Sequence, residues 1–471
     1  MFKNSIFNFL GVIIPILIGL FTIPFLINNI GVDIFGKITI IWAIIGYSGL
    51  FDLGIGKGIT QIISLDINKK KYNYLGDIIG TSISIIFVFS IFLSIIFYVS
   101  ASSIVNIIEN LNIDVYLIQL LAIAIFPTLI ISVFRSIHEA KSLFLIINLI
   151  RVPNNIWLFI APIILIFLDD FTLNNLVIYI ILGKLFFMVL YCISLFINFK
   201  EYLFKFNLSK SSMYKIFNVS GWISISNIIN PLLAYLDRFI IGATLSAAAV
   251  SYFVTPFELS SKIWIIPAAI TSTLFPFITS NLKGDLNLVY KKFTIYEFAS
   301  SLIVLLCCII CIMFNHDIIS LWISKEFADQ SAKFLTIFSI GMFFSSLGHF
   351  PLTVLHANGN FKIPAILNII MIIFYPIIFY SFVKKYGLDG AIYIWLFRVL
   401  IDYIVIYYFS LTYIIKQSII SNFNWSIIFL ILLFSIPLSN IEIYTFKFVF
   451  LFLVIIFSYF NLKSVYEKHI N

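Results

Sequence analysis

Stretches of about twenty or more apolar residues recur along the whole chain, and no other feature restricts the fold as strongly. A helix needs about 20 mostly apolar residues to cross a hydrocarbon core of roughly 30 Å. Of the 471 residues, 62% are hydrophobic and 11% are charged, whereas about a quarter are charged in a soluble domain. The stretches are too long and too continuous for barrel strands. The sequence therefore predicts an all-α polytopic membrane protein.

Fourteen transmembrane spans are expected. They fall at about 5–28, 34–64, 74–101, 114–138, 145–168, 172–198, 217–243, 248–281, 290–314, 330–356, 361–382, 390–413, 423–439 and 443–462. If the last two form a re-entrant hairpin, the number is twelve. The first span follows Lys3 and has no small-residue cleavage site, so we interpret it as a retained signal anchor.

The distribution of basic residues predicts the orientation. Lys69–Lys71 and the lysines of the linker at 201–216 lie on one side of the predicted topology, whereas Asp169 and Asp170 lie on the other. Because basic loops stay in the cytoplasm, both termini are expected there, and Lys384-Lys385 is an exception to the rule. The net charge of +8 is thus explained by topology, and no nucleic-acid partner is expected.

The two halves of the chain resemble each other. Phe25-Leu26-Ile27 recurs as Phe239-Ile240-Ile241, and His138-Glu139-Ala140 recurs as His356-Ala357-Asn358, at offsets of 214 and 218 residues. An even number of spans per half makes the repeats parallel, as in one class of transporter. The alternative is chance similarity between apolar segments. We expect a six-helix lobe at 1–200, a cytoplasmic linker at 201–216, a second six-helix lobe at 217–414, and two further helices with a cytoplasmic tail at 415–471.

Charged residues inside the spans are the candidate functional groups, because a charge at the helix centre costs about 2.5–3.5 kcal/mol. The residues expected to line a translocation cavity are Asp52, Lys57, Lys184, Asp237, Arg238, Glu258, Lys262, Arg398 and Asp402. Arg135 and Arg151 are expected near the cytoplasmic side. Glu258 and Lys262, like Arg398 and Asp402, are four residues apart and share a helix face. The alternative is that such pairs only neutralise each other and hold helices in register.

Several motifs carry a resemblance to a known family. They are Gly31 to Gly36, Tyr47 to Gly56 (YSGLFDLGIG), Arg135 to Phe144, Leu236 to Gly242 followed by Tyr252 to Pro256, Leu274-Phe275-Pro276, and Gly387 to Ala391. In this order, they resemble the polysaccharide flippases of bacterial O-antigen and capsule assembly. That family shares a superfamily with multidrug-and-toxin extruders (MATE proteins) and the peptidoglycan lipid flippase. The resemblance covers roughly residues 5 to 415.

The resemblance implies a flippase that moves an undecaprenyl-pyrophosphate-linked oligosaccharide across the bacterial inner membrane by alternating access. Its expected partners are this substrate, membrane lipids, and the polysaccharide polymerase and chain-length machinery of lipopolysaccharide or capsule assembly. Two alternatives stay open: a multidrug or cation exporter of the same fold, and a membrane glycosyltransferase or polymerase.

Signatures of enzymes and metal sites are sparse. No long loop carries an acidic pair, and no HExxH, Walker A or G-x-S-x-G element occurs. The spacing of Cys308 and Cys311 matches redox or metal motifs, but both lie in an apolar run, so we expect a packing role. A transporter without cofactor or metal is the prediction.

Overall fold

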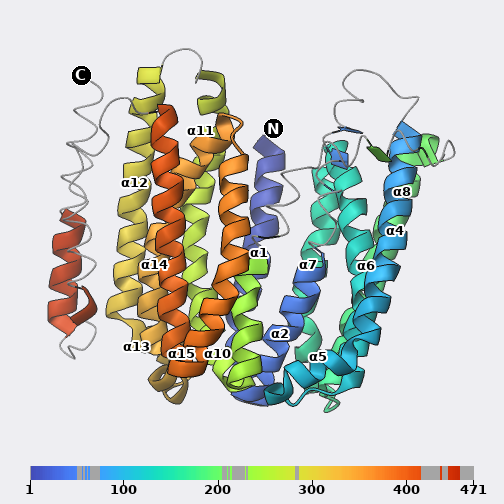
Figure 1. Cartoon of the computed structure of the whole chain (residues 1–471), viewed down its shortest axis with the longest axis horizontal. Helices are drawn as coiled ribbons and strands as arrows, with labels where there is room; N and C mark the ends of the chain where they lie inside the picture. Colours follow the sequence, from blue (N-terminus) through green and yellow to red (C-terminus); the bar gives the residue numbers. More distant parts are fainter. Residues whose placement is uncertain are drawn as a thin grey trace. The chain divides into compact units, whose positions relative to one another are not determined.

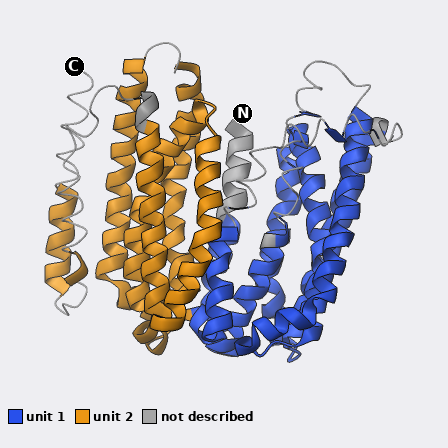
Figure 2. Cartoon of the chain, in the orientation of Figure 1, with its two compact units in different colours: residues 1–251 blue, residues 252–471 orange. Residues whose placement is uncertain are grey.

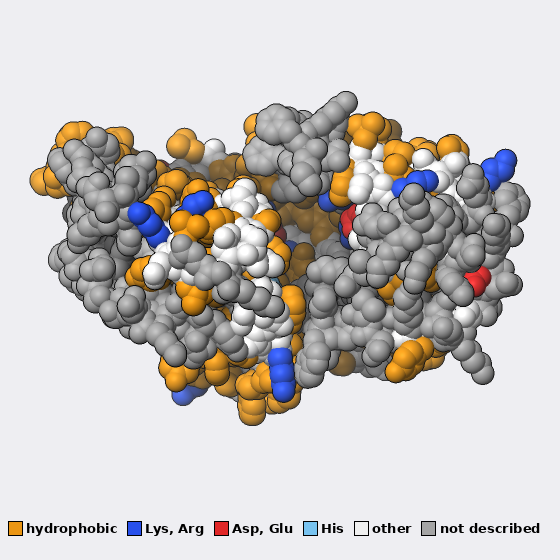
Figure 3. Space-filling view, turned by 90° about the horizontal axis from the view of Figure 1, so that it is seen from above, with side chains coloured by type: hydrophobic (Ala, Val, Ile, Leu, Met, Phe, Trp, Pro, Cys, Tyr) orange, Lys and Arg blue, Asp and Glu red, His pale blue; other side chains and the backbone are white. Residues whose placement is uncertain are grey.

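The computed structural model describes most of the chain. The described residues are 2–49, 56, 59–60, 62–63, 75–203, 209, 213–214, 229, 232–281, 286–414, 435–437 and 444–456. Within these residues every regular element is a helix, and eight helices are long and apolar enough to cross a membrane. Figure 1 shows them as long rods, and Figure 3 shows Lys and Arg side chains at several places on the end face with hydrophobic side chains around them.

The chain divides into two compact units, Met1–Ser251 and Tyr252–Asn471 (Figure 2). Two hydrogen bonds join the last part of unit 1 to earlier parts of the unit: Asn110 donates to the Ala243 carbonyl at 2.6 Å, and Ser251 donates to the Val32 carbonyl at 2.6 Å. The predicted second lobe begins earlier, at 217, and the four-part division at 200, 216 and 414 stays a prediction.

Unit 1 begins with a helical hairpin. Helix α1 (Phe2–Ile30) and helix α2 (Val32–Ser48) meet at Gly31, whose φ of 83° suits a residue without a side chain. The expected continuous helix over 34–64 is wrong, because α2 ends at Ser48 and Gly49 lies in a turn. Glycine has a low helix propensity, and the Ser48 hydroxyl binds the Ile45 carbonyl of the last turn.

Four long helices follow the hairpin in unit 1. They are α4 (Leu75–Val99), α6 (Val115–Ala140), α7 (Phe144–Phe167) and α8 (Leu173–Leu203), close to the expected spans, and a short helix α5 (Ala101–Ile107) follows α4. Helix α6 is mostly buried and packs against α4 and α8, and α7 packs against α8 and α1 (Figure 1).

The predicted span 248–281 is three helical segments in sequence. Helix α10 (Ala247–Ser261) passes through a short 3-10 turn, η3 (Lys262–Trp264), into α11 (Ile265–Asn281). Pro256 lies inside α10 and Pro276 inside α11. Proline removes an intrahelical hydrogen bond, so a proline-containing stretch favours such interruptions.

The remaining helices of unit 2 form its core. They are α12 (Leu286–Met313), the short α13 (Asn315–Trp322), α14 (Lys325–Ala357) and α15 (Lys362–Ile414). Helix α15 covers two predicted spans, and its backbone leaves the helical conformation at Gly387, where φ is 61°. Of the last two predicted spans, residues 435–437 and 444–456 are described and helical.

Candidate substrate-binding site

A polar stripe runs along one face of α6. Thr128, Ser132, Arg135 and Glu139 are spaced by four, three and four residues, which places them on the same side of a helix. Arg135 Nε lies 3.4 Å from Glu139 Oε1, and the two side chains keep 40% and 34% of their surface accessible. These two charged side chains are accessible, although most of α6 is buried. Water or a ligand can therefore reach them.

Lys184 is the second component. It lies on α8, where Phe187 and Tyr191 on the same face are buried, and only 7% of its surface is exposed. Its charge interacts with that of Arg135 across the α6–α8 contact. No hydrogen bond or ion pair joins Lys184 to another residue in the part of the chain that the structure describes.

Arg151 on α7 supplies the third positive charge. Its Nη2 donates to the Asn148 side-chain oxygen at 2.7 Å, and its charge interacts with those of Arg135 and Glu139. One turn further along α7, Asn154 is buried with its Oδ1 atom lacking a hydrogen-bond partner. Arg135, Glu139, Arg151 and Lys184 are called the basic cluster from here on.

The basic cluster extends from near the helix ends toward the middle of the spans. His138 on α6 and Ser194 on α8 are hydrogen-bonded at 2.7 Å, which puts these two positions at one level. Arg135 is three residues from that level and Lys184 is ten, or about 4.5 Å and 15 Å along the helices. Lys184 thus lies deeper in its span than Arg135 and Glu139, which are near the end of α6. That these charges bind an anion stays a prediction.

Asp237 and Arg238 are buried at 3% and 6% exposure, also in unit 1. The Arg238 guanidinium lies 5.0 Å from the centre of the Tyr235 ring, and Asp237 and Arg238 both make further interactions. Asp52 and Lys57 lie outside the described residues. Among the predicted residues of unit 1, Arg135 thus interacts electrostatically with both Arg151 and Lys184.

The predicted residues of unit 2 form two groups. Lys262 Nζ donates to Glu258 Oε2 at 3.0 Å, which confirms the expected pair. Arg398 lies 4.7 Å from the Tyr375 ring centre and interacts electrostatically with Asp402, although the Oδ1 atom of Asp402 is buried without a hydrogen-bond partner. Whether these four residues line a cavity stays a prediction.

Sequence reasoning did not select Glu139 or Asn148 as site residues. Both had a detectable signal, because Glu139 is four residues after Arg135 and Asn148 is three residues before Arg151. Among the described residues no group of three or more His, Cys, Asp or Glu side chains could hold a metal ion. Cys308 is fully buried in an apolar cluster of unit 2, as its expected packing role requires.

Comparison with known proteins decides the family. The family described as polysaccharide biosynthesis protein matches residues 1–282. The chain belongs to this family. It is also 29% identical, over 415 residues, to a protein of Shigella flexneri named "Putative O-antigen transporter", a match that covers 85% of this chain and 95% of that protein.

Solved structures show the same fold. The lipid II flippase MurJ in an inward closed conformation aligns with a TM-score of 0.75 at 15% identity over 100% of both chains. An inward-facing multidrug resistance MATE transporter aligns with a TM-score of 0.72 at 15% identity, over 86% of this chain and 98% of that one. The predicted all-α, MATE-like membrane fold is thus confirmed, and a count of about fourteen spans is consistent with it.

Proposed function

We propose that this member of the polysaccharide biosynthesis protein family is a flippase that moves an undecaprenyl-pyrophosphate-linked oligosaccharide to the outer leaflet of the bacterial inner membrane by alternating access. The observation that carries the proposal is the basic cluster, and above all the buried Lys184. The product would serve O-antigen, lipopolysaccharide or capsule assembly. A polysaccharide polymerase and chain-length proteins would then act on it after translocation.

A pyrophosphate fits the charge of the cluster. At an effective dielectric of about 20, two unit charges 4 Å apart interact by about 4 kcal/mol. Several such contacts would offset a large part of the cost of taking the phosphates out of water. Lys184 offers three N–H donors, and Arg135 and Arg151 offer planar guanidinium groups that suit phosphate oxygens.

The two alternatives fit less well. A cation exporter needs a carboxylate-rich site, whereas the basic cluster carries three positive groups and one negative. A membrane glycosyltransferase needs room outside the membrane for catalysis. The connections from α6 to α7 and from α7 to α8, at 141–143 and 168–172, are too short to supply it.

Substitution of Lys184 tests the proposal. In cells that depend on this protein for surface polysaccharide, Lys184→Ala should abolish or sharply reduce export and raise the amount of lipid-linked repeat unit on the cytoplasmic side. Protein abundance should stay near normal, because no acidic partner would be left unpaired in the described helices. Lys184→Arg should keep part of the activity, since it keeps the charge.

Lys200→Ala is the matched control, because Lys200 is an exposed lysine near the end of the same helix. It should leave export unchanged. Normal export by Lys184→Ala at normal abundance would show that the basic cluster does not bind the substrate. A loss of drug resistance with unchanged polysaccharide would favour the exporter instead.

A further inference from the structure

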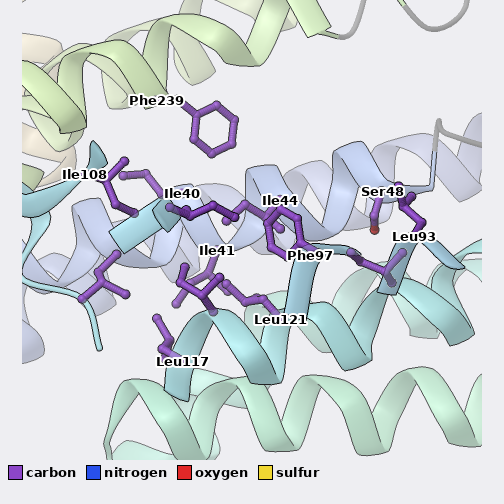
Figure 4. A pocket seen from close by; sticks show the side chains of 14 residues that line it. Ile40, Ile41, Ile44, Ser48, Leu93, Phe97, Ile108, Leu117, Leu121 and Phe239 are labelled. Carbon is purple, nitrogen blue, oxygen red and sulfur yellow. The ribbon is translucent and has the colours of Figure 1, made fainter. Parts of the chain in front are cut away.

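Unit 1 contains an apolar pocket away from the basic cluster. Its volume is about 300 Å³, and its walls come from α2, α4, α5, α6 and Phe239 (Figure 4). Ile44 of α2, Phe97 of α4 and Leu121 of α6 are among the side chains that line it. Its one polar side chain is Ser48, whose hydroxyl already donates to the Ile45 carbonyl at 2.7 Å. The lining therefore offers hydrocarbon contact and no binding group for a polar ligand.

The pocket and the basic cluster share one face of α6. Leu117, Leu121 and Ile125 line the pocket, and the same stripe continues through Thr128 and Ser132 to Arg135 and Glu139, at steps of three or four residues. This face is thus apolar over its first half and polar and charged over its second. Ile125 and Leu117 are about 15 Å and 27 Å from Arg135 along the axis.

We propose that this pocket holds the polyprenyl chain of the lipid-linked substrate while its pyrophosphate is bound at the basic cluster. The inference rests on the proposed function and adds a second binding site for the same molecule. An amphiphile with a charged head and a long hydrocarbon chain matches a helix face that changes from charged to apolar along its length. The chain would point from the cytoplasmic end of α6 toward the opposite leaflet.

The size and position of the pocket suit such a chain. An engineered cavity of about 150 Å³ accepts benzene, so 300 Å³ accepts about two isoprene units. A single polyprenyl chain fits this volume better than the paired chains of a phospholipid. Leu93 and Phe97 of α4 line the pocket, whereas the adjacent Phe92 and Ile96 are exposed by 58% and 45%. The pocket is thus only one helix away from an exposed apolar surface of unit 1.

Binding measurements on the full chain in nanodiscs test the inference. Inorganic pyrophosphate reports the head site alone, and a polyprenyl pyrophosphate reports head and chain together. We expect the polyprenyl compound to bind at least tenfold more tightly. Leu121→Trp, which fills the pocket, should remove most of that gain and leave the affinity for pyrophosphate unchanged. Ile96→Trp on the lipid-facing side of α4 is the matched control and should keep the gain.

A photoreactive side chain at position 121 gives a second readout. This readout does not require the Leu121→Trp variant to fold. It should label the polyprenyl chain more strongly than the same group at position 96. Equal labelling of the polyprenyl chain from positions 121 and 96 would overturn the inference. So would labelling of phospholipid from position 121 that the polyprenyl compound does not reduce.

The outcomes separate this inference from the proposed function. If the native protein binds pyrophosphate but Leu121→Trp keeps the full gain in affinity for polyprenyl pyrophosphate, the pocket is not used and the head site stands. If native protein does not bind pyrophosphate and Lys184→Ala changes nothing, the proposed head site is wrong, and joint binding of head and chain is wrong with it.

Discussion

His138 is a buried histidine that sequence reasoning placed only near a span end. It is fully buried, with Nδ1 2.7 Å from the Phe134 carbonyl and Nε2 2.7 Å from the Ser194 hydroxyl. A carbonyl oxygen only accepts, so Nδ1 donates to it and Nε2 of the neutral ring accepts from Ser194. Tyr191 and Phe199 pack edge-on against the ring. This residue fastens the end of α6 to α8, beside the basic cluster.

His138→Ala should destabilise the protein by about 2–4 kcal/mol, because it leaves a cavity and removes a partner of a buried hydroxyl. Ser194→Ala should cost less, about 1–2 kcal/mol, since it removes only the hydroxyl. Thermal unfolding of the purified variants in detergent measures both. The double variant should be less destabilised than the sum of the two single changes. Strict additivity would show that the hydrogen bond contributes nothing to stability.

For Arg398 and Asp402 we expect a different case, in which the pair neutralises itself and holds the helix in place. Arg398→Ala should lower the amount of folded protein, because it removes the positive charge that interacts with Asp402 in a span. The double change Arg398→Ala with Asp402→Ala should restore abundance, whether or not transport returns. Quantitative blotting of membrane fractions checks the expectation. A double variant no more abundant than the single one would contradict it.

At the scale of elements, Gly36 marks a close backbone approach. A Cβ atom there would overlap the Ala247 carbonyl oxygen at the start of α10, which lies next to the Ser251–Val32 hydrogen bond. Gly36→Ala should therefore displace α10 from α2 and strongly reduce folded protein. Gly46→Ala, on the same helix, is the matched control, because the nearest atom is Tyr235 Oη at 3.9 Å. It should be neutral or slightly stabilising, by up to about 1 kcal/mol. The yield of monodisperse protein after detergent extraction measures both.

Much of the helix pattern was predictable from the sequence. The lengths of α1, α4, α6 and α7 follow from apolar runs about as long as a membrane is thick, and Gly31 and Gly387 mark real breaks. The end of α2 at Ser48 and the short helix α5 were not predicted. A window of apolar residues contains no information about a local turn, because a broken and a continuous helix have the same hydropathy.

The site was predictable in its residue types but not in its grouping. Lys184 was selected because it is a charged residue inside a span, and Arg135 and Arg151 because they were expected near the cytoplasmic side. Their relative positions depend on how α6, α7 and α8 pack side by side, which a single sequence does not reveal. The apolar pocket gave no signal at all, since an isoleucine facing a cavity looks the same as one facing lipid.

At the scale of the whole molecule, the described loops of unit 1 differ in charge between its two ends. Lys141 follows α6, and its Nζ donates to the Asn198 carbonyl near the end of α8, so these helix ends lie together. Asp169 and Asp170 lie at the opposite end, between α7 and α8. By the positive-inside rule, we expect the end with Lys141 to face the cytoplasm. That orientation would put the basic cluster nearer the cytoplasmic leaflet, where the substrate would be loaded. The expected location of both termini in the cytoplasm stays a prediction.

Cysteine labelling tests this orientation at two exposed positions. In a variant lacking the native Cys192, Cys307, Cys308 and Cys311, Asp170→Cys should react in intact cells with a membrane-impermeant thiol reagent that passes the outer envelope. Ser142→Cys should react only after the membrane is permeabilised, because residue 142 lies next to Lys141 at the cytoplasmic end. The opposite pattern would invert the topology, and the head group would then enter the basic cluster from the outer leaflet. In that case the protein could not load its substrate where lipid-linked sugars are made, and the proposed direction of transport would fail.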